Sequence, residues 1–221
     1  MKLLQTDFNK NPNIGLYAYT TDKYCLIGKD LTDSLLKELE TVLQVPVYRV
    51  SIAGTNLIGA FCSGNNKKLL IPKMCFNDEL ERLKELKIKF SVVDTELTAL
   101  GNNILCTEKG AYINPEFSDK EVEQLKKLLD VPVIKGMIGD VEVTGATGVI
   151  RKNHAVISPY VTDEQLEKIQ HHLHVTAVKC TANFGSPYLK SALVVNSKGF
   201  IAGKLCTGVE LDDLYRGLGF K

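Results

Sequence analysis

A closed ring of five α/β units is the fold that the sequence predicts, on three observations. An apolar residue followed two places later by Gly or Pro recurs at intervals of 44, 43, 44 and 44 residues, and a small residue and a helix N-cap signal recur on the same period. The last unit is incomplete, and the first residues of the chain supply what it lacks. A fixed period of this length indicates a repeat architecture. The stop residues are Gly28, Pro72, Pro115, Pro159 and Gly203.

Each unit opens with a small residue that lets the backbone turn. In SIAGTNLIGAFCSGNNKKLLIP, residues 51–72, an apolar strand ends, a second strand follows through a polar tip, and Pro72 stops the return strand. The opening residues are Gly15, Gly59, Gly101, Gly145 and Ser191. We therefore predict a single domain of units at residues 14–56, 57–100, 101–144, 145–190, and 191–221 closed by 1–13.

A helix follows the hairpin of each unit. Its predicted N-caps are Thr32, Asn77, Ser118, Thr162 and Thr207, four of them followed directly by Asp. Side-chain oxygens of Ser, Thr and Asn accept the unpaired N–H groups of a first helical turn, and a following acid suits the helix dipole. Leucines at helical spacing alternate with charged residues, as in EVEQLKKLLD. The charged faces indicate helices on the outside, with the strands towards the axis.

The two ends of the chain complement each other. Residues 191–221 stop just after their helix, without the closing strand that residues 45–50, 88–93, 131–134 and 175–180 supply elsewhere, whereas residues 2–8 form one apolar strand. An open solenoid needs capping repeats, and a bare strand edge invites aggregation. We infer a ring with pseudo-fivefold symmetry in which the N-terminal strand completes the last unit.

Composition and charge exclude several classes of protein. The chain has 221 residues, a net charge of +1 and 24% charged residues, which argues against binding nucleic acid chiefly by bulk phosphate attraction. No apolar run approaches the roughly 18 residues of a membrane-spanning helix, and the start lacks the apolar core of a signal peptide. The six cysteines show no metal-ligand spacing. We expect a cytoplasmic protein with free thiols.

The search for cofactor and metal sites favours structural roles. The glycine-rich segment GMIGDVEVTGATG lacks the GK[ST] ending of a phosphate-binding loop. His171, His172 and His174 lie at a predicted helix C-terminus, where the dipole stabilises imidazolium, and no second ligand cluster accompanies them. We predict no cofactor and no metal.

An enzyme remains the alternative reading. Rings of five such units are known as penteins, and several act on guanidino groups through Cys, His and acidic residues around the axis. Cys206 and His154 are the candidates for a hydrolase or transferase of this kind. However, Cys206 lies within KLCTG, just before the last helix and without a neighbouring histidine. A cysteine and a distant histidine do not define a nucleophilic site without the geometry.

The whole chain resembles the archaeal and eukaryotic translation initiation factor 6 family. The matching strings occur in order and at the family's spacing. They are Phe8-Asn9…Ile14-Gly15, Tyr24-Cys25-Leu26, Ser51-Ile-Ala-Gly54, Ile58-Gly59, Cys62…Gly64-Asn65, Leu69-Leu-Ile-Pro72, Ala99-Leu-Gly-Asn102 and Val194-Val-Asn196. Eukaryotic members carry a longer C-terminal tail, so we expect an archaeal-type member. Ala60 and Asn66 stand where many members carry basic residues.

The resemblance implies a pentein that is not an enzyme. It implies a monomeric anti-association factor that binds the large (50S) ribosomal subunit near the sarcin–ricin loop, largely through ribosomal protein with local ribosomal RNA contact. The bound factor blocks the small (30S) subunit from joining and has a role in large-subunit maturation. Neither a membrane nor a small-molecule substrate is expected as a partner.

Seven residues are predicted to face the ribosome. The resemblance implies Asn102 at a unit join, and Gly64 with Asn65 at the second hairpin tip. Four more come from their proximity to the joins, namely Thr55, Asn56, Glu96 and Thr147. For Asn102, Gly64 and Asn65 the alternative is a turn residue chosen for its backbone conformation, since Asn and Gly are common in turns.

Overall fold

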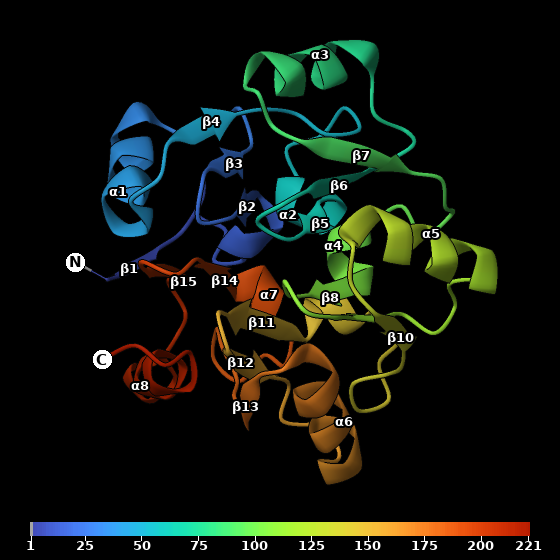
Figure 1. Cartoon of the computed structure of the whole chain (residues 1–221). Helices are drawn as coiled ribbons and strands as arrows, with labels where there is room; N and C mark the ends of the chain where they lie inside the picture. The colour runs from blue at the N-terminus through green and yellow to red at the C-terminus, as the bar shows by residue number, and fades with distance from the viewer. Residues whose placement is uncertain (1) are drawn as a thin grey trace.

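Five three-stranded sheets surround a central axis in the computed structural model, which describes residues 2–221, and the longer helices lie outermost (Figure 1). Each sheet is an antiparallel hairpin whose second strand also pairs in parallel with a third strand. The hairpins are β2 (Ala18–Thr20) with β3 (Cys25–Ile27), β5 (Ser63–Gly64) with β6 (Leu69–Pro72), β8 (Ile104–Cys106) with β9 (Ala111–Ile113), β11 (Gly148–Arg151) with β12 (His154–Ile157), and β14 (Leu193–Val195) with β15 (Phe200–Gly203). The predicted fold class is confirmed.

The third strand of each sheet follows an outer helix, except in the last sheet. The third strands are β4 (Val47–Arg49), β7 (Phe90–Val93), β10 (Val133–Lys135), β13 (Thr176–Lys179) and β1 (Leu3–Thr6). The outer helices are α1 (Asp33–Leu43), α3 (Asn77–Glu85), α5 (Asp119–Leu129), α6 (Asp163–Leu173) and α8 (Gly208–Gly217). Each outer helix buries one fully covered apolar residue at an equivalent place: Leu39, Leu83, Leu125, Ile169 and Leu214.

The N-terminal strand closes the ring as predicted. β1 pairs in parallel with β15, in a register that runs from Leu3 opposite Phe200 to Thr6 opposite Gly203. The first strand of the chain therefore serves as the third strand of the last sheet.

Four of the five predicted N-caps are confirmed, and Asn77 is wrong. Thr32, Ser118, Thr162 and Thr207 accept N–H groups of the first helical turn through their side chains. In the second unit Phe76 holds the N-cap position and Asn77 is the first helical residue. The carboxylate of Glu79 reaches back to the Phe76 N–H at 2.9 Å, so one unpaired donor at this helix end is satisfied without a polar N-cap side chain.

The ring has two chemically different ends. The hairpin tips, residues 21–24, 65–68, 107–110, 152–153 and 196–199, gather at one end, which we call the tip end. The second and third strands of every sheet run from the tips towards the other end. There the chain turns through residues 7–13, 50–57, 94–99, 136–143 and 180–188, and the outer helices begin. We call this the loop end.

Candidate functional site

Five short helices form the hub of the ring. They are η1 (Ile14–Leu16), α2 (Ile58–Phe61), α4 (Leu100–Asn103), η2 (Thr144–Ala146) and α7 (Leu189–Ala192), and each contacts the next until the circle closes. A Cβ atom on the glycine that opens any of the first four units would overlap a backbone carbonyl of the preceding unit. The small residues recognised from the sequence are therefore required by the close approach of backbones at the axis.

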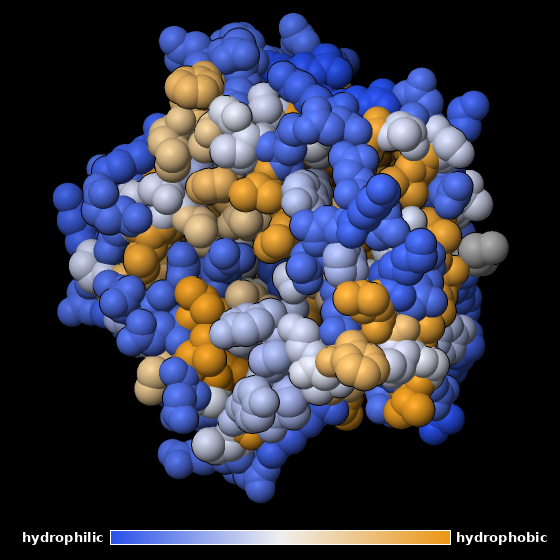
Figure 2. Space-filling model, turned by 180° about the vertical axis from the view of Figure 1, so that it is seen from behind, coloured by the Kyte–Doolittle hydropathy of each residue, from blue (hydrophilic) through white to orange (hydrophobic). Residues whose placement is uncertain are grey.

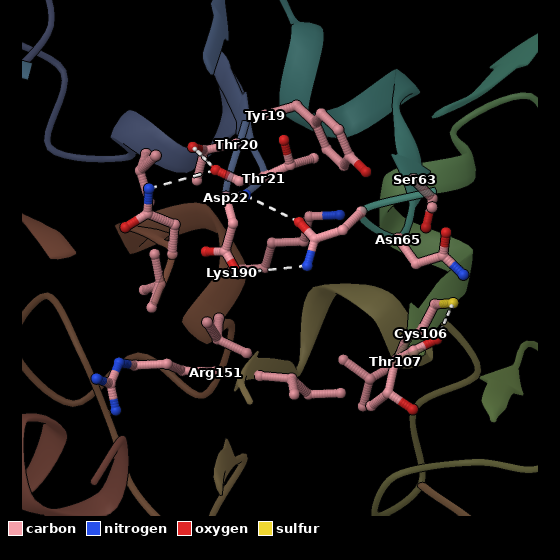
Figure 3. Close-up of a pocket in the computed structure, with 18 of the residues that line it drawn as sticks. Tyr19, Thr20, Thr21, Asp22, Ser63, Asn65, Cys106, Thr107, Arg151 and Lys190 are labelled. Atoms are coloured by element: carbon pink, nitrogen blue, oxygen red, sulfur yellow. Dashed lines mark hydrogen bonds between the residues drawn. The ribbon is translucent and has the colours of Figure 1, made fainter. Parts of the chain in front are cut away.

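A pocket of about 330 Å³ lies on the axis above this hub. The first hairpin strands β2, β5, β8, β11 and β14 line it, and the five hairpin tips form its rim. Lys190 of α7 extends into the pocket (Figure 3). Its ammonium group donates to the carbonyl oxygen of Gly101 at 2.7 Å.

Hairpin tips join each unit to its neighbour by capping the neighbour's outer helix. Asn65 donates to the carbonyl oxygen of Leu129 at the end of α5, at 3.4 Å. Two other tips make equivalent contacts, Thr107 with Leu173 and Asn196 with Leu43, and Arg151 at the end of β11 donates to Leu218 just after α8. These bonds satisfy carbonyl groups that a helix end leaves unpaired.

The predicted pair at the second tip is thus part of the ring's own structure. Asn65 is 7% exposed, and its side-chain amide oxygen Oδ1 also accepts from the Lys67 and Lys68 N–H groups. Gly64 has φ +133°, and a Cβ atom there would overlap the Lys68 carbonyl oxygen. Both residues serve the turn and the contact between units.

Thr55 and Asn56, predicted to face the ribosome, make hydrogen bonds within and next to the loop of residues 50–57. The Thr55 hydroxyl donates to the Ile52 carbonyl oxygen and accepts from the Leu57 N–H. Asn56 donates to Asp30 and accepts from the Lys29 N–H at 3.0 Å, which ties the loop to the segment between β3 and α1.

The remaining three predicted residues differ in exposure. Glu96 is exposed and pairs with Lys73 at 2.6 Å. Asn102 is partly buried on α4 and does not line the axial pocket. Thr147 is 1% exposed, with its hydroxyl donating to the Thr144 carbonyl oxygen, so it has no surface to offer a partner.

The structure therefore divides the predicted set between the two ends. Thr55 and Asn56 lie in the loop of residues 50–57, and Glu96 lies in the loop of residues 94–99; both loops are at the loop end. Asn102 lies in α4, which directly follows the loop of residues 94–99 and contacts α2, the short helix that follows the loop of residues 50–57. Gly64 and Asn65 lie at the tip end.

Exposed apolar side chains at the loop end were missed from the sequence. Of the ten large apolar residues that the structure shows exposed, eight lie there, in the loops or around the first turns of outer helices: Met74, Phe76, Met137, Tyr160, Phe184, Tyr188, Leu205 and Val209. Figure 2 shows such patches within a largely hydrophilic surface. The available signal was an apolar residue within two positions of three predicted N-caps, namely Phe76, Tyr160 and Leu205, outside the period of the buried helix face. Clusters of this kind mark interaction surfaces.

The alternative catalytic pair is not assembled. His154 opens β12 at the tip end, whereas Cys206 follows β15 at the loop end of a different unit. Cys206 is 5% exposed, its sulfur accepts from the Asn183 N–H at 3.2 Å, and burial raises the pKa of the thiol. A buried, protonated thiol without an adjacent base is a poor nucleophile.

The three helix-end histidines have separate environments. His174 takes the left-handed conformation at the C-cap of α6, while His172 Nε2 lies 3.1 Å from the Ala111 carbonyl oxygen of the neighbouring unit. Desolvation by burial lowers the pKa of His172. Among residues 2–221 no group of three His, Cys, Asp or Glu side chains is arranged to hold a metal ion. Within the same residues, no helix has the length and hydrophobicity needed to cross a membrane.

Fold and hub together define a pentein-type α/β propeller. The chain belongs to the eIF-6 family, whose family model matches residues 3–216. Similar proteins include translation initiation factor 6 of Thermococcus onnurineus (strain NA1), 33% identical over 226 residues, covering 100% of this chain and 99% of that protein. The factor of the same name from Sulfolobus acidocaldarius is 33% identical over 202 residues, covering 90% and 91%.

Two solved enzyme structures show a weaker likeness. C. jejuni agmatine deiminase is 13% identical with a TM-score of 0.43, covering 71% of this chain and 60% of that one. SxtG, an amidinotransferase from Microseira wollei, is 10% identical with a TM-score of 0.46, covering 81% and 64%. A similarity this weak does not extend to activity.

Proposed function

We propose that the protein binds the large ribosomal subunit through its loop end and so keeps the small subunit from joining. Membership of the eIF-6 family supports a ribosomal partner. The observation that carries the choice of surface is the gathering of exposed apolar side chains, with Phe184 81% and Val209 73% exposed, at the end that also holds Asn102 and Glu96.

The charges at the loop end favour docking on ribosomal protein over docking on RNA alone. Two of its lysines are paired within the chain, Lys73 with Asp94 and Glu96, and Lys204 with Asp7. Binding to phosphates draws on unpaired Lys and Arg, whereas protein interfaces have apolar centres and mixed polar rims. A stable interface of about 800 Å² per partner is a small part of the 10044 Å² surface of the chain.

The hub gives the small protein a rigid ring, which suits it to block an interface of a much larger particle. Backbone contacts between the short helices and helix capping by neighbouring tips make the five units depend on one another. A ring held this way presents a preformed surface, so little ordering entropy is lost on binding. The factor acts as a cytoplasmic steric block that needs no cofactor, and the same occupancy gives it a role in maturation of the large subunit.

Co-sedimentation with isolated archaeal subunits tests this proposal. We expect stoichiometric binding to large subunits, none to small subunits, and loss of joined ribosomes in a gradient assay. Asn102→Ser should weaken binding roughly tenfold, as expected for a residue near the centre of an interface, with an unchanged circular dichroism spectrum. Asn153→Ser, the same substitution at an exposed tip-end position, is the matched control. Equal binding to both subunits, or none to the large one, would refute the proposal.

A further inference from the structure

The axial pocket is independent of the proposed docking surface, because it opens at the opposite end of the ring. Its volume of about 330 Å³ falls at the lower limit of small-molecule sites, which begin near 300 Å³. Figure 3 shows Lys190 and Tyr19 extending into the space between the hairpin strands.

Lys190 places a positive charge without a counter-charge in this pocket. Its ammonium group makes one hydrogen bond, to the Gly101 carbonyl oxygen, and no carboxylate within residues 2–221 forms an ion pair with it. An ammonium group has three donors, so two remain for another partner. Desolvation lowers the pKa of Lys190 to about 8, which leaves it mainly cationic at neutral pH. An unpaired charge in such surroundings is costly unless an anion accompanies it.

Tyr19 of β2 supplies a second donor. Its side chain lines the pocket and the residue is only 9% exposed, yet its hydroxyl has no hydrogen-bond partner in the part of the chain that the structure describes. A phenolic hydroxyl can donate one hydrogen bond, so this group is available to an acceptor inside the pocket. Desolvation by burial raises the pKa of Tyr19, which keeps the hydroxyl protonated and able to donate.

The acidic residues of the pocket lie at its rim and are already occupied. Asp22 accepts from the Ser197 N–H at 2.7 Å, and Glu108 accepts from the Asn66 N–H at 2.6 Å. Arg151, the other long basic side chain with polar contacts at the rim, donates to backbone carbonyl oxygens of residues 197, 218 and 219. The Arg151 Nε is unpaired but buried. Lys190 and Tyr19 therefore offer accessible donors inside the pocket, beside aliphatic walls that include Leu105 and Val149.

We propose that this pocket binds a small oxyanion, a carboxylate or a phosphate, whose oxygens pair with the Lys190 ammonium group and accept from the Tyr19 hydroxyl. The volume admits a free anion or a short-chain organic acid or phosphate monoester, and the aliphatic walls contact its carbon atoms.

Titration of the full chain with succinate and, separately, with inorganic phosphate tests the site and distinguishes the two oxyanions. Binding is measured by calorimetry and by the rise in melting temperature at constant ionic strength, with sodium chloride as the reference salt. We expect saturable binding of at least one anion. Lys190→Met should weaken it at least tenfold, since a charge-assisted hydrogen bond is lost, and Tyr19→Phe should weaken it several-fold.

Lys152→Met, which removes an exposed charge at the same rim, is the matched control and should bind as the unsubstituted chain does. If Lys190→Met unfolds, Tyr19→Phe alone decides, because it changes one hydroxyl. Binding of neither anion, or binding unaffected by Lys190→Met and Tyr19→Phe, would overturn the proposal. Weakening by Lys152→Met to the same degree would overturn it as well, since that result indicates general attraction of anions to the rim.

Discussion

Leu4 of β1 lies in parallel register with Ile201 of β15, although the two residues come from opposite ends of the chain. Ile201 is fully buried, and Leu4 packs against the same apolar cluster, which also contains Phe8 and Leu39 of α1. The first and last units thus share one core, and neither is complete without the other.

Removal of residues 1–8 should destabilise the whole ring. The deletion takes away the parallel partner of β15 and the buried Phe8, whose loss alone costs about 3–5 kcal/mol. For a chain of this length that loss lowers the melting temperature by roughly 10 °C or more, in a single transition followed by circular dichroism. An unchanged melting temperature, or separate melting of one end, would contradict closure of the ring.

Gly101→Ala should be severely destabilising, by about 3 kcal/mol or more, as expected when a backbone contact must open. A Cβ atom there would overlap the carbonyl oxygen of Gly59 in the neighbouring short helix. Gly208→Ala is the matched control, because no atom lies within 4 Å of its Cβ position at the start of α8. Ala should stabilise that helix by up to about 1 kcal/mol. Urea unfolding gives both values, and equal effects at the two glycines would refute the role of the hub.

Glu210 of α8 accepts hydrogen bonds from the loop of residues 180–188 and should make the stability of the protein depend on pH. Burial alone would raise the pKa of its carboxylate, but N–H donors from Thr207 and Gly185 outweigh burial and hold the pKa below the ordinary value of 4.5. A carboxylate whose pKa is lower in the folded state than in the unfolded chain stabilises the fold at pH values above its pKa in the unfolded chain. That contribution is lost as the pH falls through the folded value.

Glu210→Gln should therefore lower the free energy of unfolding by about 1–3 kcal/mol at pH 7, and the difference should narrow below pH 4.5. Urea unfolding at pH 7, 5 and 3.5 measures it. Glu167→Gln, at an exposed position on α6, should change little at any of these values. A Glu210→Gln effect that does not vary with pH would show that the charge is not responsible.

The repeat could be predicted because its causes are local. Thr162 with Gln165, and Ser118 with Glu121, form capping boxes between residues three apart, and the period only repeats such patterns. The missing last strand was visible by comparing units. The prediction of Asn77 was wrong because the helix begins one residue earlier than the polar side chain suggests, with Phe76 at the N-cap and Glu79 pairing with its N–H.

The site could be predicted less well because it depends on contacts between units. Asn65 looked free for a partner in a hairpin tip, but its amide donates to Leu129 of another unit. Lys190 attracted no attention in the sequence, since nothing local indicates that its side chain crosses the hub to Gly101. Exposure of Phe184 follows from a left-handed backbone held by Glu210, which also lies distant in the chain.

Phe184→Asn should separate docking from folding. Phe184 is 81% exposed and has φ +63°, a conformation that Asn tolerates well, so the substitution removes apolar surface without straining the backbone. We expect binding to large ribosomal subunits to weaken about tenfold or more, as for an aromatic residue at an interface centre, and the melting temperature to stay within about 2 °C, as for a surface change.

Lys152→Asn is the matched control for that experiment, because Lys152 is exposed, has φ +55° and lies at the tip end. It should leave binding to large subunits unchanged when both variants are compared by co-sedimentation over a range of concentrations. The opposite result, with Lys152→Asn weakened and Phe184→Asn unaffected, would place the docking surface at the tip end. In that case the axial pocket would face the ribosome, and an anion held by Lys190 would lie beneath the interface.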